Sequence, residues 1–176
     1  MSEKLTSRQE ALALLKKHDC STQIIKHCMA VAELALKTAI IIQGRGIPVD
    51  VHLVEIGALL HDIGRSKTHN VDHAIIGAGI AKHSGLPESI ISIIKRHVGA
   101  GITPDEAKKF GWKKDVYIPI ALEEKIVAYA DNLIEKSKLA SIEITIEKLI
   151  KEKKIEAANR VRKLDDEINN LIGIKS

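Results

Sequence analysis

Apolar residues recur every three or four positions along most of this chain, a spacing that predicts amphipathic helices. Isoleucine, a residue typical of strands, supplies much of the apolar content, but its spacing here is helical. We therefore expect an all-α protein. The apolar row is regular near the C-terminus, where it consists of Ile155, Ala158, Val161, Leu164, Ile168 and Leu171.

Capping and stop signals place the ends of the expected helices. Ser7 and Glu10 have the spacing of a capping box, and the glycines within residues 44–46 interrupt the apolar pattern. Residues 65–70 are expected to form a polar loop, and residues 112–119 an irregular segment with a short extended piece. The expected helices cover about residues 8–17, 22–43, 51–62, 71–83, 88–97, 103–111 and 122–137, and one or two helices lie between 142 and 172.

No internal repeat or linker divides the chain, so we expect one domain, a helical bundle over residues 1–176. Residues with recognisable chemistry fall within about 20–140, and about 141–176 form a C-terminal helical extension. Because the last helix is amphipathic, it can pack on a second copy of the chain, and a homo-oligomer remains an open expectation.

Composition and charge exclude several classes of protein. Hydrophobic residues make up 45% of the chain and charged residues 28%, as in folded globular proteins. Aromatic residues make up only 2%, so the residues with which a nucleic-acid binder stacks bases are nearly absent, and no nucleic-acid partner is expected. The net charge of +4 gives a basic surface that attracts phosphate-bearing molecules.

Three absences indicate a cytoplasmic protein that does not span a membrane. No apolar stretch reaches the length of a membrane span, and the N-terminus lacks the apolar run of a secretory segment. Cys20 and Cys28 form no CxxC motif, and a disulfide between them is not expected.

The dipeptide His61-Asp62 at the end of an apolar helix carries the main chemical signal. A carboxylate against hydrocarbon is costly unless something compensates its charge, and a metal cation is a common solution. Six ligands are too many for one closed structural zinc site and enough for a catalytic centre of one or two metals. The other four candidates lie on apolar faces of expected helices and are His27, His73, His97 and Asp131.

Each of these residues also has an ordinary structural interpretation. A single histidine on an apolar face is more often a hydrogen-bonded core residue than a ligand, and Asp131 alone could pair with Lys125. Taken together, however, four inward histidines and two inward carboxylates would leave several polar groups without partners in a small core. A shared metal satisfies them all, and we therefore expect a metal centre.

The order His27, His61-Asp62 and Asp131 resembles the HD-domain superfamily of metal-dependent phosphohydrolases, over roughly residues 20–140. Residues 73–78 are similar to the HGxxGA segment of that family, with Ala74 in place of its second residue. His97 matches the later histidine of a six-ligand branch, which includes symmetric dinucleoside tetraphosphate hydrolases and diiron oxygenases.

The resemblance implies one metal held by His27, His61, Asp62 and Asp131, with Asp62 bridging to a second metal held by His73 and His97. Imidazole and carboxylate ligands suit Fe, Mn, Ni, Co or Zn better than Mg. A water between two such cations loses a proton easily and can attack phosphorus.

Two basic residues follow the His-Asp pair directly. Arg65, with Asp62, is expected to take part in catalysis, and both Arg65 and Lys67 are expected to bind substrate phosphate. An exposed loop charge is an equally good interpretation of Lys67. His69 has a ligand-like spacing to His73, but it falls in the polar loop, so we leave it outside the site.

These observations predict a metal-dependent phosphohydrolase acting on a nucleotide or a related small phosphate ester. One alternative is a diiron oxygenase of the HD-domain type, which uses the same six ligands; the basic residues after Asp62 favour phosphate instead. Another is a non-catalytic nucleotide-sensing module, which would have no need of a complete ligand set.

Overall fold

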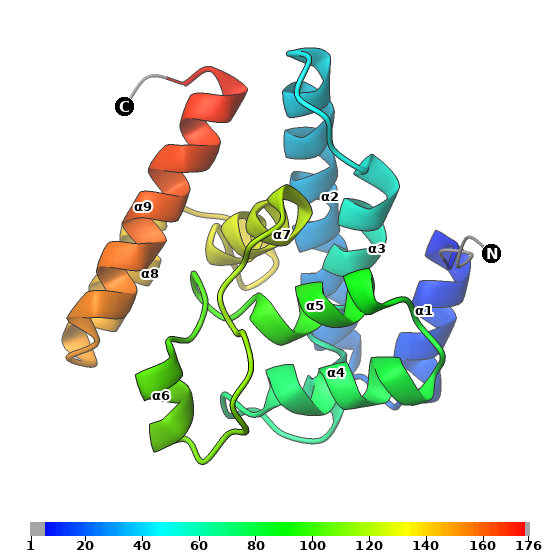
Figure 1. Cartoon of the computed structure of the whole chain (residues 1–176). Helices are drawn as coiled ribbons and strands as arrows, with labels where there is room; N and C mark the ends of the chain where they lie inside the picture. Colours follow the sequence, from blue (N-terminus) through cyan, green and yellow to red (C-terminus); the bar gives the residue numbers. More distant parts are fainter. Residues whose placement is uncertain (1–5, 175–176) are drawn as a thin grey trace.

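The computed structural model describes residues 6–174 of the chain (Figure 1). Helices dominate, as predicted, and the remaining regular structure is a 3-10 turn, η1, and one short hairpin. In chain order the elements are α1 (Arg8–Lys17), α2 (Thr22–Gly44), α3 (Val51–Leu60), η1 (Ile63–Ser66), α4 (His73–His83), α5 (Glu88–Arg96), α6 (Pro104–Lys109), α7 (Leu122–Asn132), β1 (Ile134–Glu135), β2 (Lys138–Leu139), α8 (Ile142–Lys151) and α9 (Ile155–Ile172).

The capping signals place the helix starts well. The Ser7 hydroxyl accepts a hydrogen bond from the amide of Glu10 at 3.2 Å, and the Glu10 carboxylate accepts one from the Ser7 amide at 2.7 Å. Ser21 and Asp50 cap α2 and α3 through their side chains. Each of these contacts satisfies an amide that the first turn of a helix leaves without a partner.

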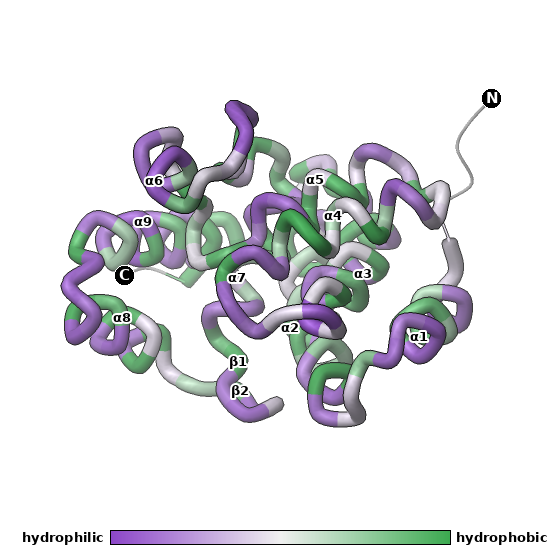
Figure 2. Tube along the Cα trace, turned by 90° about the horizontal axis from the view of Figure 1, so that it is seen from below, coloured by the Kyte–Doolittle hydropathy of each residue, from purple (hydrophilic) through white to green (hydrophobic). Residues whose placement is uncertain are grey.

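The core is aliphatic, as the composition predicts. Helix α3 lies between α2, α5 and α7 and contacts all three. Hydrophobic and hydrophilic positions alternate along the helical tubes, as expected for helices that bury one face (Figure 2). The largest fully buried side chains are Leu15, Ile42, Ile56, Leu59, Leu60, Ile63, Ile90, Ile93, Ile94, Ile126, Ile146 and Ile168.

Three predicted boundaries near the functional residues are wrong. The polar loop begins later than predicted, because residues 63–66 continue from α3 as η1, and α4 begins at His73 rather than residue 71. The helix predicted to reach residue 137 ends at Asn132. Lys136 and Ser137 adopt positive φ values of 48° and 62°, which are incompatible with a right-handed helix, and the chain turns there into the β1–β2 hairpin.

The C-terminal extension forms a pair of helices, α8 and α9, at one side of the molecule (Figure 1). Ile146, Ala158 and Val161 form a small apolar cluster of their own. Leu164 and Ile168, further along α9, join the main core. In the described part of the chain, no helix has both the length and the apolar character needed to cross a membrane.

Candidate metal centre

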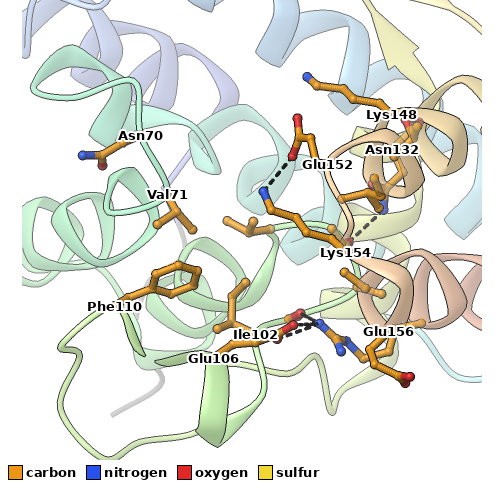
Figure 3. A pocket seen from close by; sticks show the side chains of 18 of the residues that line it. Asn70, Val71, Ile102, Glu106, Phe110, Asn132, Lys148, Glu152, Lys154 and Glu156 are labelled. Carbon is orange, nitrogen blue, oxygen red and sulfur yellow. Dashed lines mark hydrogen bonds and ion pairs between the residues drawn. The ribbon is translucent and has the colours of Figure 1, made fainter. Parts of the chain in front are cut away.

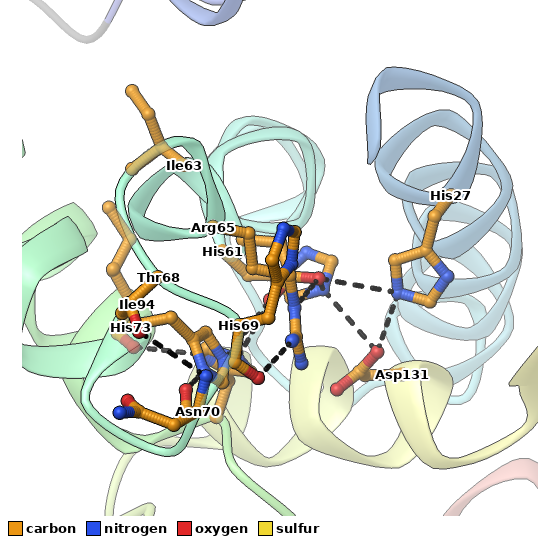
Figure 4. A network of polar contacts seen from close by, with 12 residues as sticks. His27, His61, Ile63, Arg65, Thr68, His69, Asn70, His73, Ile94 and Asp131 are labelled. Carbon is orange, nitrogen blue, oxygen red and sulfur yellow. Dashed lines mark hydrogen bonds and ion pairs between the residues drawn. The ribbon is translucent and has the colours of Figure 1, made fainter. Parts of the chain in front are cut away.

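Five helices deliver the six predicted ligands to one place. His27 comes from α2 and Asp131 from α7, whereas the others lie at helix ends. Figure 4 shows His27 and Asp131 approaching from one side and His73 from the other. The ligands at or next to helix ends are His61 and Asp62 after α3, His73 at the start of α4, and His97 after α5.

Two glycines allow η1 and α4 to approach closely enough to bring Asp62 beside His73. A Cβ on Gly64 would lie 1.9 Å from the carbonyl oxygen of His73 and 2.6 Å from the amide nitrogen of Gly77. A Cβ on Gly77 would lie 3.1 Å from the amide nitrogen of Gly64. Backbone meets backbone at this crossing, so a side chain at Gly64 would force the two elements apart.

The two carboxylate oxygens of Asp62 face different histidines. Its Oδ1 lies 3.2 Å from Nε2 of His73 and 3.4 Å from Nε2 of His97. Its Oδ2 lies 3.8 Å from Nε2 of His27 and 3.7 Å from Nε2 of His61.

Asp131 completes the group that faces Oδ2 of Asp62. Its Oδ1 lies 2.9 Å from Nε2 of His27 and 3.3 Å from Nε2 of His61. The ligand atoms of His27, His61 and Asp131 lie within 4.8 Å of one another, and so do those of His61, Asp62 and His97. Either group is compact enough to surround one metal ion.

Backbone carbonyls fix the orientation of three of the imidazole rings. The Nδ1–H groups of His61, His73 and His97 each donate to a carbonyl oxygen three residues earlier, at 2.7 Å in every case. In the neutral ring this leaves the Nε2 lone pair pointing into the centre, as in many metal-binding histidines.

The inward atoms of the centre lack ordinary partners. Nε2 of His73 lies 3.0 Å from Nε2 of His97, so in the neutral rings two lone pairs face each other. Nε2 of His61 and Oδ1 of Asp62 are buried without a hydrogen-bond partner. A divalent cation would satisfy these donor atoms together, and the set therefore fits a metal.

The ionisation of the centre follows from the mutual contacts of its residues. Burial alone would raise the pKa of Asp62, but His61, His73 and His97 hold the pKa well below its usual range. The pKa of Asp131 is lowered in the same way, against its burial, by His61 and His27. Burial lowers the pKa of His97.

His61 shows the opposite balance. Burial would lower its pKa, but Asp62 and Asp131 raise it well above the usual value. The two carboxylates therefore favour the form of His61 that carries a second proton. Metal ions would take the place of that proton, since a ligating imidazole must be neutral.

The two predicted phosphate-binding residues lie differently with respect to the centre. Nε of Arg65 donates to Oδ2 of Asp62 at 2.6 Å, and Nη1 donates to the carbonyl oxygen of His69 at 3.3 Å. The Arg65 side chain is 32% exposed and lines the adjacent cleft. Lys67 is exposed and does not line that cleft. His69 is also exposed, and it lines the cleft.

A cleft of about 870 Å³ opens beside the centre (Figure 3). The predicted ligand His73 and Arg65 both line it, and α8 and α9 supply much of the rest. The sequence predicted these last helices as an extension, without a role in the site. The basic residues of the lining are Arg65, Lys109, Lys148, Lys153, Lys154 and Arg160, and the acidic ones Glu106, Glu135, Glu152 and Glu156.

Comparison with known proteins agrees with this geometry. The sequence profile described as HD domain matches residues 24–135. The chain is 46% identical over 166 residues to an uncharacterized protein of Methanocaldococcus jannaschii, covering 93% of this chain and 98% of that protein. It is 40% identical over 169 residues to the tRNA (cytidine(56)-2'-O)-methyltransferase of Picrophilus torridus. That match covers 96% of this chain and 48% of the methyltransferase, so this chain spans about half the length of that relative.

Among solved structures, the chain is similar to the HD domain of the L. monocytogenes phosphodiesterase PgpH, determined in complex with cyclic-di-AMP. The TM-score is 0.56 at 20% sequence identity, and the match covers 93% of this chain and 99% of that chain. At this identity the likeness shows a shared fold.

Proposed function

Because this chain belongs to the HD-domain family, we propose that it is a metal-dependent phosphohydrolase, which cleaves a phosphate ester or anhydride of a nucleotide or a related small molecule. The observation that carries the proposal is the arrangement of the six ligands, in which one carboxylate oxygen of Asp62 faces each group of histidines.

The ligands divide naturally between two ions. His27, His61 and Asp131 would hold one with Oδ2 of Asp62, whereas His73 and His97 would hold the other with Oδ1. The mixture of imidazole and carboxylate suits Fe, Mn, Ni, Co or Zn. When bound, such ions would polarise phosphoryl oxygens and lower the pKa of a water between them.

Arg65 would hold and orient the substrate phosphate. Its Nε donates to Asp62 and its Nη1 to the carbonyl oxygen of His69, and within residues 6–174 no hydrogen bond engages Nη2, which would donate to the phosphate. A guanidinium held in this way is well suited to a phosphate because its donors are planar and fixed. Lys67 is close to Arg65 in sequence, but from outside the cleft it would attract the substrate rather than hold it.

Metal analysis followed by a hydrolysis screen tests the proposal. We expect the purified protein, loaded with Mn, Fe, Co, Ni or Zn, to release product from at least one mononucleotide, cyclic dinucleotide or dinucleoside polyphosphate, as measured by chromatography. Asp62→Ala should lose both metal and activity. Asp166→Ala, which removes an exposed carboxylate of α9, is the matched control and should retain both.

Other outcomes would replace the proposal. An iron-loaded protein that consumes oxygen and hydrolyses none of these compounds would be an oxygenase, since the same six ligands serve both chemistries. A protein that binds nucleotides without either reaction would be a sensing module. The methylation named for the Picrophilus relative carries no prediction for this chain, which covers about half of that protein.

A further inference from the structure

Aromatic residues are rare in this chain, yet most of them occur together. The sequence has one Phe, one Trp and two Tyr, and Phe110, Trp112 and Tyr117 form one cluster. The ring centroids of Phe110 and Trp112 are 5.4 Å apart, and those of Trp112 and Tyr117 are 4.9 Å apart. None of these three residues belongs to the main core, which is mostly aliphatic and contains the fourth aromatic residue, Tyr129.

The cluster is attached to the metal centre. The indole Nε1–H of Trp112 donates to Oδ1 of Asp72 at 2.7 Å, and Asp72 directly precedes the metal ligand His73. The buried Tyr117 donates its hydroxyl to the carbonyl oxygen of Lys113 at 2.9 Å. Trp112 and Tyr117 are thus fixed, and they hold the start of α4 and the aromatic segment in one relative position.

Phe110 differs from its two neighbours in presenting its ring to the cleft. It ends α6, is 44% exposed and lines the same cleft as Arg65 and His73. Figure 3 shows Phe110 and Val71 on one side of this cleft, with Lys148 and Glu156 on the other. An exposed phenyl ring, supported from behind by Trp112, is a surface on which a flat apolar group can stack.

The rest of the cleft suits a molecule with both an apolar and an anionic part. Its volume of about 870 Å³ lies within the range of small-molecule sites. Lys154 and Arg160 are paired with Glu152 and Glu106, but Lys109 adjoins Phe110 in sequence and has no carboxylate within salt-bridge distance among the described residues. The apolar residues of the lining include Val71, Ile102, Ile144, Leu149 and Ile155.

We infer that this cleft is a nucleobase site, in which the base of the substrate stacks on Phe110 while its phosphate lies at Arg65 and the metal centre. The inference rests on the proposed function and narrows its substrate class to base-bearing nucleotides, excluding sugar phosphates and other phosphate esters without a base. A stacked base typically contributes about 1–3 kcal/mol to binding.

Trp112 provides a direct test, because it is the only tryptophan of the chain and contacts Phe110. Metal-loaded protein is mixed in a stopped-flow instrument with AMP or with ribose 5-phosphate, and tryptophan emission is read before turnover. We expect AMP to change the emission and to bind at least about fivefold more tightly than ribose 5-phosphate, the fold-change that corresponds to one stacked base.

Substitutions of Phe110 separate stacking from simple burial. Phe110→Ala and Phe110→Leu should both remove the preference for AMP, whereas Phe110→Tyr should keep it. All three should bind ribose 5-phosphate like the unaltered protein. Ile120→Ala is the control, because Ile120 is an exposed apolar residue outside the cleft. Melting temperatures identify any variant that fails to fold.

Equal binding of AMP and ribose 5-phosphate, or an unchanged preference in Phe110→Ala, would overturn the inference. Its failure can be told apart from failure of the proposed function. Hydrolysis of both compounds at equal efficiency would leave the phosphohydrolase standing without a base site. Conversely, Phe110-dependent binding of AMP with no hydrolysis of any phosphate compound would leave a base site without the proposed activity.

Discussion

Asp62 connects the two halves of the centre, because each of its carboxylate oxygens faces a different group of histidines. Its place in a cluster of polar side chains could be predicted from the sequence, since a carboxylate at the end of an apolar helix requires compensation. The sequence also placed His27 and Asp131 on inward faces, but both side chains are 22% exposed. Helical spacing gives the face of a residue and not the depth to which its neighbours cover it.

Arg65 is the residue-scale case in which binding and folding roles can be separated. Arg65→Ala should lower kcat/KM at least tenfold, equivalent to about 1.4 kcal/mol, because a charged contact to substrate phosphate is lost. The melting temperature of the metal-loaded protein should change little, since the side chain is partly exposed and its ion pair with Asp62 contributes modestly once metal is bound. Steady-state kinetics and thermal melts measure both effects.

The matched control is Arg162→Ala, which removes an exposed arginine on α9 outside the cleft. This variant should leave both kcat/KM and the melting temperature unchanged. Normal kinetics in Arg65→Ala would instead identify Arg65 as an ordinary surface charge.

At the scale of elements, local signals and long-range contacts differed in how well they could be predicted. Ser7, Ser21 and Asp50 act through amides no more than three residues away, so the starts of α1 to α3 follow from the sequence alone. The end of α7 could not be predicted, because the apolar spacing continues past Asn132, whereas the chain leaves the helix there and turns back at residues 136–137. That turn contains no glycine or proline to announce it.

The crossing of η1 and α4 predicts opposite effects for two glycines of one helix. Gly77→Ala should lower the free energy of unfolding by about 1–3 kcal/mol, because its Cβ would lie 2.9 Å from Cγ2 of Ile94 and 3.1 Å from the amide nitrogen of Gly64. Gly79→Ala should raise it by about 0.5–1 kcal/mol, since no atom lies within 4 Å and alanine favours the helix.

Urea unfolding of both variants, with metal content measured in parallel, checks this prediction. Gly77→Ala should also bind less metal, because His73 is displaced with α4, whereas Gly79→Ala should bind the normal amount. Equal stability of the two variants would mean that the close approach of η1 and α4 does not position the centre.

At the scale of the whole molecule, the role of the C-terminal helices could not be predicted. Their contacts with the rest of the protein join residues far apart in sequence, such as Arg160 with Glu106 and Tyr129 with Asn169. Amphipathic spacing showed that α9 buries one face, but not what that face covers. The cleft, with Phe110 on one wall and α8 and α9 on another, arises only from this docking.

If α9 is part of one cooperative domain, a cavity in its apolar face should destabilise the whole protein. Ile168 is fully buried in the main core, so Ile168→Ala should lower the free energy of unfolding by about 2–5 kcal/mol in a single transition. Ile150→Ala, at an exposed position of α8, should change it by no more than about 0.5 kcal/mol. Two separate transitions in urea would show that the C-terminal helices unfold independently.

The number of metal ions should depend on which ligand is removed. The His97→Ala variant should retain one ion per chain, because His27, His61, Asp131 and Oδ2 of Asp62 remain as a complete group. Asp131→Ala should weaken the binding of only the ion that this group of four ligands holds. Asp62→Ala should weaken both, since its two oxygens serve both groups. Elemental analysis after exhaustive dialysis gives the stoichiometry.

Thermal stability provides an independent measure of how strongly each variant binds metal. A ligand that binds only the folded state stabilises it by about 2.7 kcal/mol at a hundredfold excess over its Kd. Added metal should therefore raise the melting temperature of the unaltered protein most, that of His97→Ala less, and that of Asp62→Ala least. His52→Ala, which removes an exposed histidine of α3, should respond like the unaltered protein. One ion per chain in both the unaltered protein and His97→Ala, with equal thermal shifts, would restrict the centre to a single ion, held by the group that contains Asp131.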